Sequence, residues 1–128
     1  MDEVDRIIYA GNVFTVEWYV TARGRSSALE YFGTLSDRQQ DRFLALIRTI
    51  GDIGKIFNTT KFNYEGNEIY AFKPQPDRFL CFFYTGRKII VTNGFRKKTQ
   101  KLPASEKNKA LLAKQDYKKR IEEESYYE

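Results

Sequence analysis

The sequence predicts an α+β fold, in which a small twisted antiparallel β-sheet packs against an N-terminal helical hairpin and a further helix follows at the C-terminus. Two observations predict it. Apolar residues alternate or form continuous runs near the N-terminus and in the second half of the chain, whereas residues 26–54 follow a helical period. The helical segments are thus grouped apart from a strand meander. At 128 residues, the chain is expected to form one domain, residues 1–128.

The first strand is expected within residues 6–20, RIIYAGNVFTVEWYV. Ile, Val and aromatic residues, which favour strands, dominate this segment. Ala10-Gly11-Asn12 is expected to form a turn or bulge inside it. From Phe14 to Val20, apolar side chains alternate with Thr15, Glu17 and Tyr19, as in a strand buried on one side.

Two helices are expected next, joined by a short link. A serine at position 26 or 27 caps the first, which continues to about residue 35. Ser36 followed three residues later by Gln39 has the form of a capping box and predicts the start of the second. Either Gly51 or Gly54 ends it. The hairpin is expected to cover one face of the sheet, without a chemical role of its own.

The second half of the chain predicts strands separated by turns. The last two strand segments are so apolar that they are expected to be central in the sheet and buried on both faces. The expected strand segments are KFNY (61–64), EIYAFK (68–73), RFLCFFY (78–84) and KIIVTNGF (88–95).

A last helix is expected after Pro103 and Ser105. Its apolar stripe is thin, so it is expected to be marginal and peripheral. The final residues, 124–128, are expected to be a frayed tail.

The composition excludes several classes of function. The chain has no His, which excludes histidine-based zinc sites, Ser-His-Asp and Cys-His nucleophiles, and acid–base catalysis by imidazole. Its one cysteine, Cys81, lies in an apolar run and is expected to be a core residue. No signal peptide is evident, and no apolar stretch approaches the roughly 20 residues of a membrane span. A cytoplasmic protein without membrane contact is therefore expected.

Positive charge is concentrated in one region. Ten of the 22 Lys and Arg residues lie between Asn93 and Arg120, against two of the 17 acidic residues, and the whole chain has a formal charge of +5. This balance favours nucleic acid, an anionic membrane or an acidic protein as the partner. Because turns bring strand ends together, Lys73, Arg78 and the segment Arg96–Lys98 are expected to converge on one cationic hollow.

Such a hollow suits phosphate. Neutralising each phosphate releases counterions, and a guanidinium offers two parallel donors. Phe95 and Tyr84 are candidates for stacking on bases. On charge alone, however, a solvated strand end without a ligand is the slightly better interpretation.

Several segments together resemble the C-terminal half of RelE/ParE-superfamily toxins, and most closely the HigB-like, phage-derived branch. The specific motif is Gly-Phe-x-Lys-Lys-Thr-x-Lys-x-Pro, which here is GFRKKTQKLP at residues 94–103. The resemblance implies a type II toxin that acts as a ribosome-dependent mRNA endoribonuclease, or mRNA interferase, without metal or cofactor. It also implies a cognate antitoxin, often a helix-turn-helix protein, with which the toxin forms a hetero-oligomer.

The hypothesis of an mRNA interferase without His gives roles to individual residues. Arg78 and Arg96 would stabilise the charge on the phosphate under attack, and Lys97 or Lys73 would accept the proton. Lys98 and Lys101 would bind the RNA backbone.

The chain departs from the family pattern at several positions. Relatives often carry Glu at the position of Ala71 and Tyr at that of Asp77, and some use a catalytic His, which this chain lacks. A non-enzymatic member of the same fold is therefore the alternative, either a gyrase-directed toxin or a phage protein that binds nucleic acid or a partner. A DNA-binding regulator ranks last, because no helix-turn-helix signal accompanies the basic residues.

Overall fold

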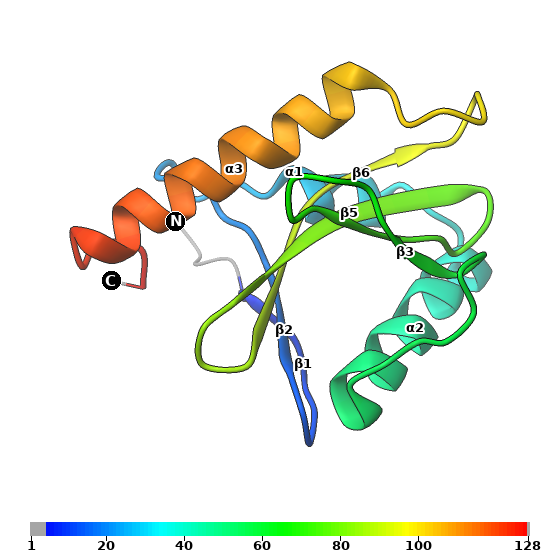
Figure 1. The fold of residues 1–128 in the computed structure, drawn as a ribbon, viewed down its shortest axis with the longest axis horizontal. Coiled ribbons are helices and arrows are strands. Elements are labelled where there is room, and N and C mark those ends of the chain that lie inside the picture. The colour runs from blue at the N-terminus through cyan, green and yellow to red at the C-terminus, as the bar shows by residue number, and fades with distance from the viewer. Residues whose placement is uncertain (1–4, 128) are drawn as a thin grey trace.

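The structure, a computed structural model, describes residues 5–127. One six-stranded sheet has the strand order β1-β2-β6-β5-β4-β3, and α2 and α3 lie on its opposite sides (Figure 1). The predicted α+β class is confirmed. In chain order the elements are β1 (Ile7–Ala10), β2 (Thr15–Trp18), α1 (Ser27–Gly33), α2 (Asp37–Ile53), β3 (Phe62–Tyr64), β4 (Tyr70–Phe72), β5 (Asp77–Tyr84), β6 (Lys88–Arg96) and α3 (Ala104–Glu122).

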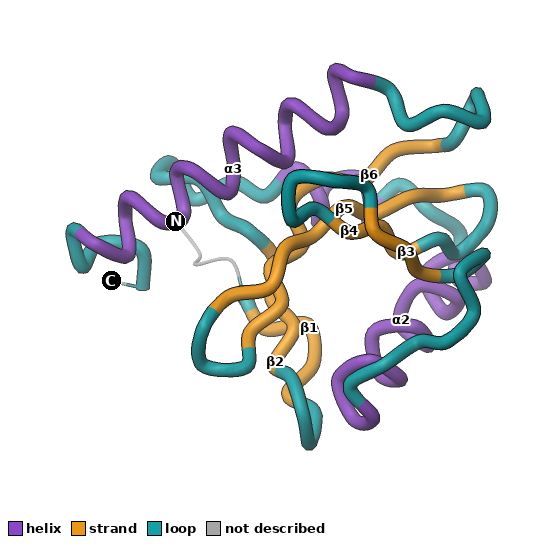
Figure 2. Tube along the Cα trace, viewed as in Figure 1, coloured by secondary structure: helices purple, strands orange, loops and turns teal. Residues whose placement is uncertain are grey.

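The sheet is antiparallel except at one pairing, because β2 runs parallel to β6. The route of the chain explains this exception. The helices α1 and α2 carry the chain from β2 to the far edge of the sheet, and β3 to β6 then meander back toward β2 (Figure 2). β6 therefore arrives between β5 and β2. As predicted, β5 and β6 are the central apolar strands, and their middle residues are buried.

The N-terminal segment forms two strands rather than one. β1 and β2 pair antiparallel, and the turn between them contains Gly11, as expected. The amide of Gly11 donates to the carbonyl of Phe14 over 2.9 Å. The amides of Val13 and Phe14 donate to the carbonyl of Gly51, over 2.7 and 2.9 Å. The hairpin is thereby joined, backbone to backbone, to the last turn of α2.

The two helices begin where their caps predict. Ser26 caps α1 by accepting from the amide of Leu29, and Ser36 and Gln39 form the complete capping box of α2. Gly54, at φ +86°, ends α2 in the left-handed conformation that glycine adopts without strain. The hairpin covers one face of the sheet through a core of aromatic and aliphatic side chains that includes Trp18, Phe43, Ile47, Ile50, Phe72 and Phe79.

The C-terminal helix is better packed than its composition predicts. Ala110 and Tyr117 of α3 are fully buried against the second face of the sheet, so the expectation of a marginal, peripheral helix is wrong. Its small alanines permit close approach to the sheet, and the ring of Tyr117 is buried beside them. Tyr84, expected to stack on bases, instead packs edge-on against Tyr117 at 4.9 Å between ring centroids.

The tail that follows α3 is ordered as far as the structure describes it. Tyr126 is 1% exposed, and its hydroxyl accepts a hydrogen bond of 3.0 Å from the amide of Val20. The hydroxyl of Tyr127 donates to the carboxylate of Glu17 over 2.9 Å. A frayed tail was expected over residues 124–128, whereas the ring of Tyr126 is part of the core on the α3 side. Glu128 lies outside the described residues.

Within residues 5–127, no helix combines the length and the apolar character that crossing a membrane requires.

Candidate functional site

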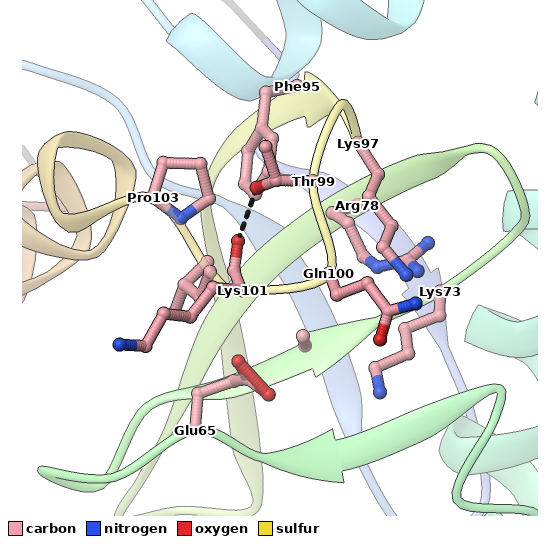
Figure 3. A pocket seen from close by; sticks show the side chains of 11 residues that line it. Glu65, Lys73, Arg78, Phe95, Lys97, Thr99, Gln100, Lys101 and Pro103 are labelled. Atoms are coloured by element: carbon pink, nitrogen blue, oxygen red, sulfur yellow. Dashed lines mark hydrogen bonds between the residues drawn. The ribbon is translucent and has the colours of Figure 1, made fainter.

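An open pocket lies on the α3 side of the sheet, where β4, β5 and β6 meet the loop that leads into α3 (Figure 3). Four of its lining residues are cationic and one is acidic. The lining consists of Glu65, Ala71, Lys73, Arg78, Phe95, Lys97, Thr99, Gln100, Lys101, Leu102 and Pro103.

Three of the four residues predicted to be catalytic meet in this pocket. Lys73 follows the end of β4, Arg78 is near the start of β5, and Lys97 follows β6. The two antiparallel pairings explain the convergence, because the end of one strand lies beside the start of the next. Phe95, which is opposite Arg78 in the register, and Lys101 complete the predicted set within the pocket.

Arg96, Lys98 and Tyr84 do not line the pocket. Successive side chains of a strand point to opposite faces, so Arg96 is turned away from the side that Phe95 and Lys97 share. Arg96 lies on the helical-hairpin side, near Tyr31. Burial is the main cause that raises the pKa of the Tyr31 hydroxyl, and the positive charge of Arg96 opposes that rise. Lys98 is exposed in the loop. The expected convergence of all three consecutive cations is therefore wrong.

Arg78 is held so that part of its guanidinium remains free. The residue is only 7% exposed, and Nη1 donates to Gln75 Oε1 over 3.2 Å and to the carbonyl of Asp77 over 2.9 Å. Nε and Nη2 make no hydrogen bond to any described residue. Burial is the main cause that lowers the pKa of Arg78, and Glu65 and Asp77 oppose it. A fixed guanidinium with unused donors can receive an anion.

The carboxylate of Asp77 supports this arrangement from the other face of the sheet. It is 1% exposed and accepts hydrogen bonds from the Tyr31 hydroxyl and, over 3.3 Å, from Gln39 Nε2. Both helices of the hairpin are thus connected to the start of β5. The departure from the family pattern at Asp77 therefore has a structural role, since it fixes the backbone that carries Arg78.

The loop that closes the pocket is anchored at both ends. Asn93 in β6 is 2% exposed, and its Nδ2 donates to the carbonyl and to the carboxylate of Glu106, each over 3.1 Å. This contact fixes the start of α3 against β6. Within the loop, the hydroxyl of Thr99 donates to the carbonyl of Lys101 over 2.9 Å. The cations of the loop are therefore presented by an ordered backbone.

None of the four pocket cations is paired with a carboxylate. The five ion pairs within residues 5–127 involve Arg25, Lys88, Lys109, Lys114 and Arg120 instead. Unpaired cations around an open pocket favour an anionic ligand, because each retains its charge for that ligand. Within the same described residues, no group of three or more Cys, Asp or Glu side chains is arranged to hold a metal ion.

Glu65 is a charged residue of the pocket that was not among the predicted site residues. It follows β3 in the β3–β4 hairpin, and its Oε1 accepts a hydrogen bond of 2.8 Å from Asn63 Nδ2. Glu65 is far in sequence from the basic segment, and no motif connects the two. The nearest indication was that relatives often carry Glu where this chain has Ala71, a residue that lines the same pocket and lies opposite Asn63.

Lys73 is expected to titrate below the ordinary lysine pKa of about 10.4. Burial lowers the pKa of Lys73 most, Glu65 opposes this, and the charges of Arg78 and Lys97 add to the lowering. As pH rises, Lys73 should therefore lose its proton before an ordinary lysine does. NMR of ¹⁵N-labelled lysine Nζ would measure this, and Arg78→Gln should raise the value by removing a neighbouring cation. A titration at or above the ordinary value would contradict the expectation.

Comparison with known protein families identifies a relationship. A family model described as phage-derived protein Gp49-like (DUF891) matches residues 30–115, a span that runs from α1 into α3 and contains every residue of the pocket. No curated protein matches the chain.

Proposed function

This chain belongs to the Gp49-like family of phage-derived proteins, part of the RelE-like group of type II toxins, and from this membership we propose that it is the toxin of a toxin–antitoxin pair. Its activity is ribosome-dependent cleavage of mRNA. The observation that carries the proposal is the convergence of Lys73, Arg78, Lys97 and Lys101, all unpaired, on one open pocket.

The proposed chemistry uses the RNA itself as the nucleophile. The 2′-hydroxyl attacks the adjacent phosphate, a reaction that requires neither a metal ion nor a cofactor. Arg78 and Lys97 stabilise the negative charge that builds up on the phosphorus oxygens, because their charges are fixed before the reaction begins. The ribosome holds the mRNA in line, and such orientation is worth roughly 7–11 kcal/mol.

Four of the remaining predicted residues are assigned to binding. Phe95 offers a ring within the pocket on which a base can stack, and Lys101 contacts a phosphate. Arg96, exposed on the helical-hairpin side of the sheet, and Lys98, exposed in the loop after β6, contact phosphates of flanking nucleotides and do not touch the reacting one. Tyr84 is left in the core, without contact to RNA.

The partner that restrains this activity is a cognate antitoxin, as membership of the group implies. A helix-turn-helix protein encoded by an adjacent gene is the expected form. Complex formation would give a toxin–antitoxin hetero-oligomer.

The test is induction of the chain in cells, followed by mapping of RNA 5′ ends. New 5′-hydroxyl ends clustered inside translated frames are expected, with 2′,3′-cyclic phosphates on the upstream fragments, because the 2′-oxygen becomes bonded to phosphorus. Lys55→Ala serves as the control variant, since Lys55 is exposed and does not line the pocket. It should cleave like the parent chain.

Two other outcomes would overturn the assignment. Double-strand breaks in DNA without new RNA ends would indicate the alternative of a gyrase-directed toxin. Growth unaffected, with neither RNA nor DNA cleaved, would indicate a phage protein that uses the fold only for binding.

A further inference from the structure

The pocket contains one carboxylate among its four cations. Glu65 lies on one side of the pocket in Figure 3, and Lys73, Arg78 and Lys97 gather on the other. The amide of Glu65 donates to the carbonyl of Ile69 over 2.8 Å, so its backbone position is fixed by the hairpin.

The side chain of Glu65 is oriented but not neutralised. Asn63 Nδ2 holds Oε1 at 2.8 Å, and Oε2 makes no hydrogen bond or ion pair with any described residue. Its charge nevertheless acts across the pocket, because Glu65 raises the pKa of Lys73 and of Arg78 against the effect of burial.

This arrangement is unfavourable for a pocket that only binds phosphate. A carboxylate repels a phosphate anion, so it weakens binding at a site where every other charge strengthens it. A carboxylate is, however, well suited to accept a proton at neutral pH, where glutamate is ordinarily ionised. A lysine is a less effective acceptor, since only its neutral form can take a proton and an ordinary lysine is almost entirely protonated at neutral pH.

We propose that Glu65 is the proton acceptor of the cleavage reaction, an inference that rests on the proposed function. The O2′–H bond breaks, and its proton moves to Oε2 of Glu65. The O2′ electron pair forms a bond to phosphorus, and the bond from phosphorus to the 5′-oxygen breaks. The ammonium group of Lys73 gives a proton to that leaving oxygen. Asn63 is a positioning residue that aims the carboxylate.

The proposal changes the roles expected of the lysines. The sequence led to Lys97 or Lys73 as the proton acceptor, whereas here both stay protonated in the ground state. Burial and neighbouring cations lower the pKa of Lys73, which makes its ammonium group a stronger acid toward the 5′-oxygen. Activity should therefore decline on the alkaline side below the pH at which an ordinary lysine titrates.

The test is Glu65→Gln, which keeps the size of the side chain and the acceptor for Asn63. Cleavage of ribosome-bound mRNA is expected to fall about 100-fold, the lower range for loss of a general base. Affinity for an RNA oligonucleotide with a 2′-deoxy scissile nucleotide should stay equal or increase, because a repulsive charge is removed. Glu65→Asp should retain the acidic limb of the pH–rate profile at a lower rate, and Glu65→Gln should lose that limb.

Glu68→Gln is the matched control. It is the same substitution in the same hairpin, but Glu68 is exposed, pairs with Lys114 at 3.1 Å and does not line the pocket. It should cleave like the parent. If Glu65→Gln cleaves within threefold of the parent and keeps the acidic limb, Glu65 is not the acceptor, although the proposed function stands. If the parent cleaves no RNA, both inferences fail.

Discussion

Arg78→Ala is expected to lower the rate of ribosome-dependent RNA cleavage by about 100- to 1000-fold, the loss typical of removing one preorganised donor. The guanidinium is positioned by Gln75 and by the Asp77 carbonyl before substrate arrives. The residue lines the pocket and keeps Nε and Nη2 without a partner among the described residues, so two parallel donors can bind the phosphate as its charge develops. The neighbouring lysines cannot replace that fork, because an ammonium group is a point charge without two parallel donors.

Arg96→Ala is the matched comparison for this prediction. Arg96 lies opposite Asp77 in the register of β5 and β6, one position from Phe95, but on the other face of the sheet. Its loss should reduce cleavage by less than about tenfold, as expected for one exposed phosphate contact. Arg78→Lys should fall between the two, since it keeps the charge without the fork.

Single-turnover cleavage of mRNA on purified ribosomes separates these variants, and growth arrest on induction gives a second measurement. Thermal unfolding of each variant checks that the fold is retained. The pocket is the wrong site if Arg78→Ala cleaves at the parental rate. It is also the wrong site if Arg96→Ala is the more damaging substitution.

The convergence of the cations was predictable because it follows from local rules. Lys73 directly follows β4 and Arg78 is the second residue of β5, so the turn between the two strands brings them together. The face of each side chain was also predictable in principle. Successive side chains of a strand point to opposite faces, so the consecutive residues Arg96 and Lys97 cannot share one pocket. The prediction treated the consecutive cations as one cluster and did not apply this alternation.

Glu65 could not be placed from the sequence. Its position depends on the turn between β3 and β4, where Gly66, Asn67 and Glu68 all have positive φ. Residues other than glycine rarely adopt this conformation, so the residue types at positions 67 and 68 did not predict this turn. The carboxylate reaches the pocket only because this turn fixes the register of the two strands.

The packing of α3 was missed for a different reason. Counting apolar residues undervalues Tyr117 and Tyr126, whose rings lie 4.6 Å apart in an edge-to-face contact. A tyrosine buries a large ring when its hydroxyl has a partner, and here Tyr117 and Tyr127 share a hydrogen bond of 2.7 Å. A helix with few aliphatic residues, such as the 19-residue α3, can therefore complete a core.

Gly11→Ala is expected to lower the free energy of unfolding by roughly 3 kcal/mol, the upper range for inserting a methyl group into packed structure. A Cβ at position 11 would lie 2.3 Å from the carbonyl carbon of Gly51 and 2.4 Å from its oxygen. Both are backbone atoms, so no side-chain rotation can relieve the clash. The methyl group must instead separate the β1–β2 hairpin from α2, which stretches the hydrogen bonds from Val13 and Phe14 to Gly51.

Gly33→Ala provides the control for this substitution. Nothing lies within 4 Å of a Cβ built at Gly33, and its backbone is outside the left-handed region, so stability should change by less than about 0.5 kcal/mol. Urea denaturation would measure both variants, and the midpoint should fall for Gly11→Ala alone, with a drop in Tm of roughly 10 °C. Equal stability of the two variants would mean that α2 does not approach the β1–β2 hairpin so closely.

The contact between α2 and the β1–β2 hairpin also matters for the pocket. The helix α2 packs against β4 and β5, and these strands position Lys73 and Arg78.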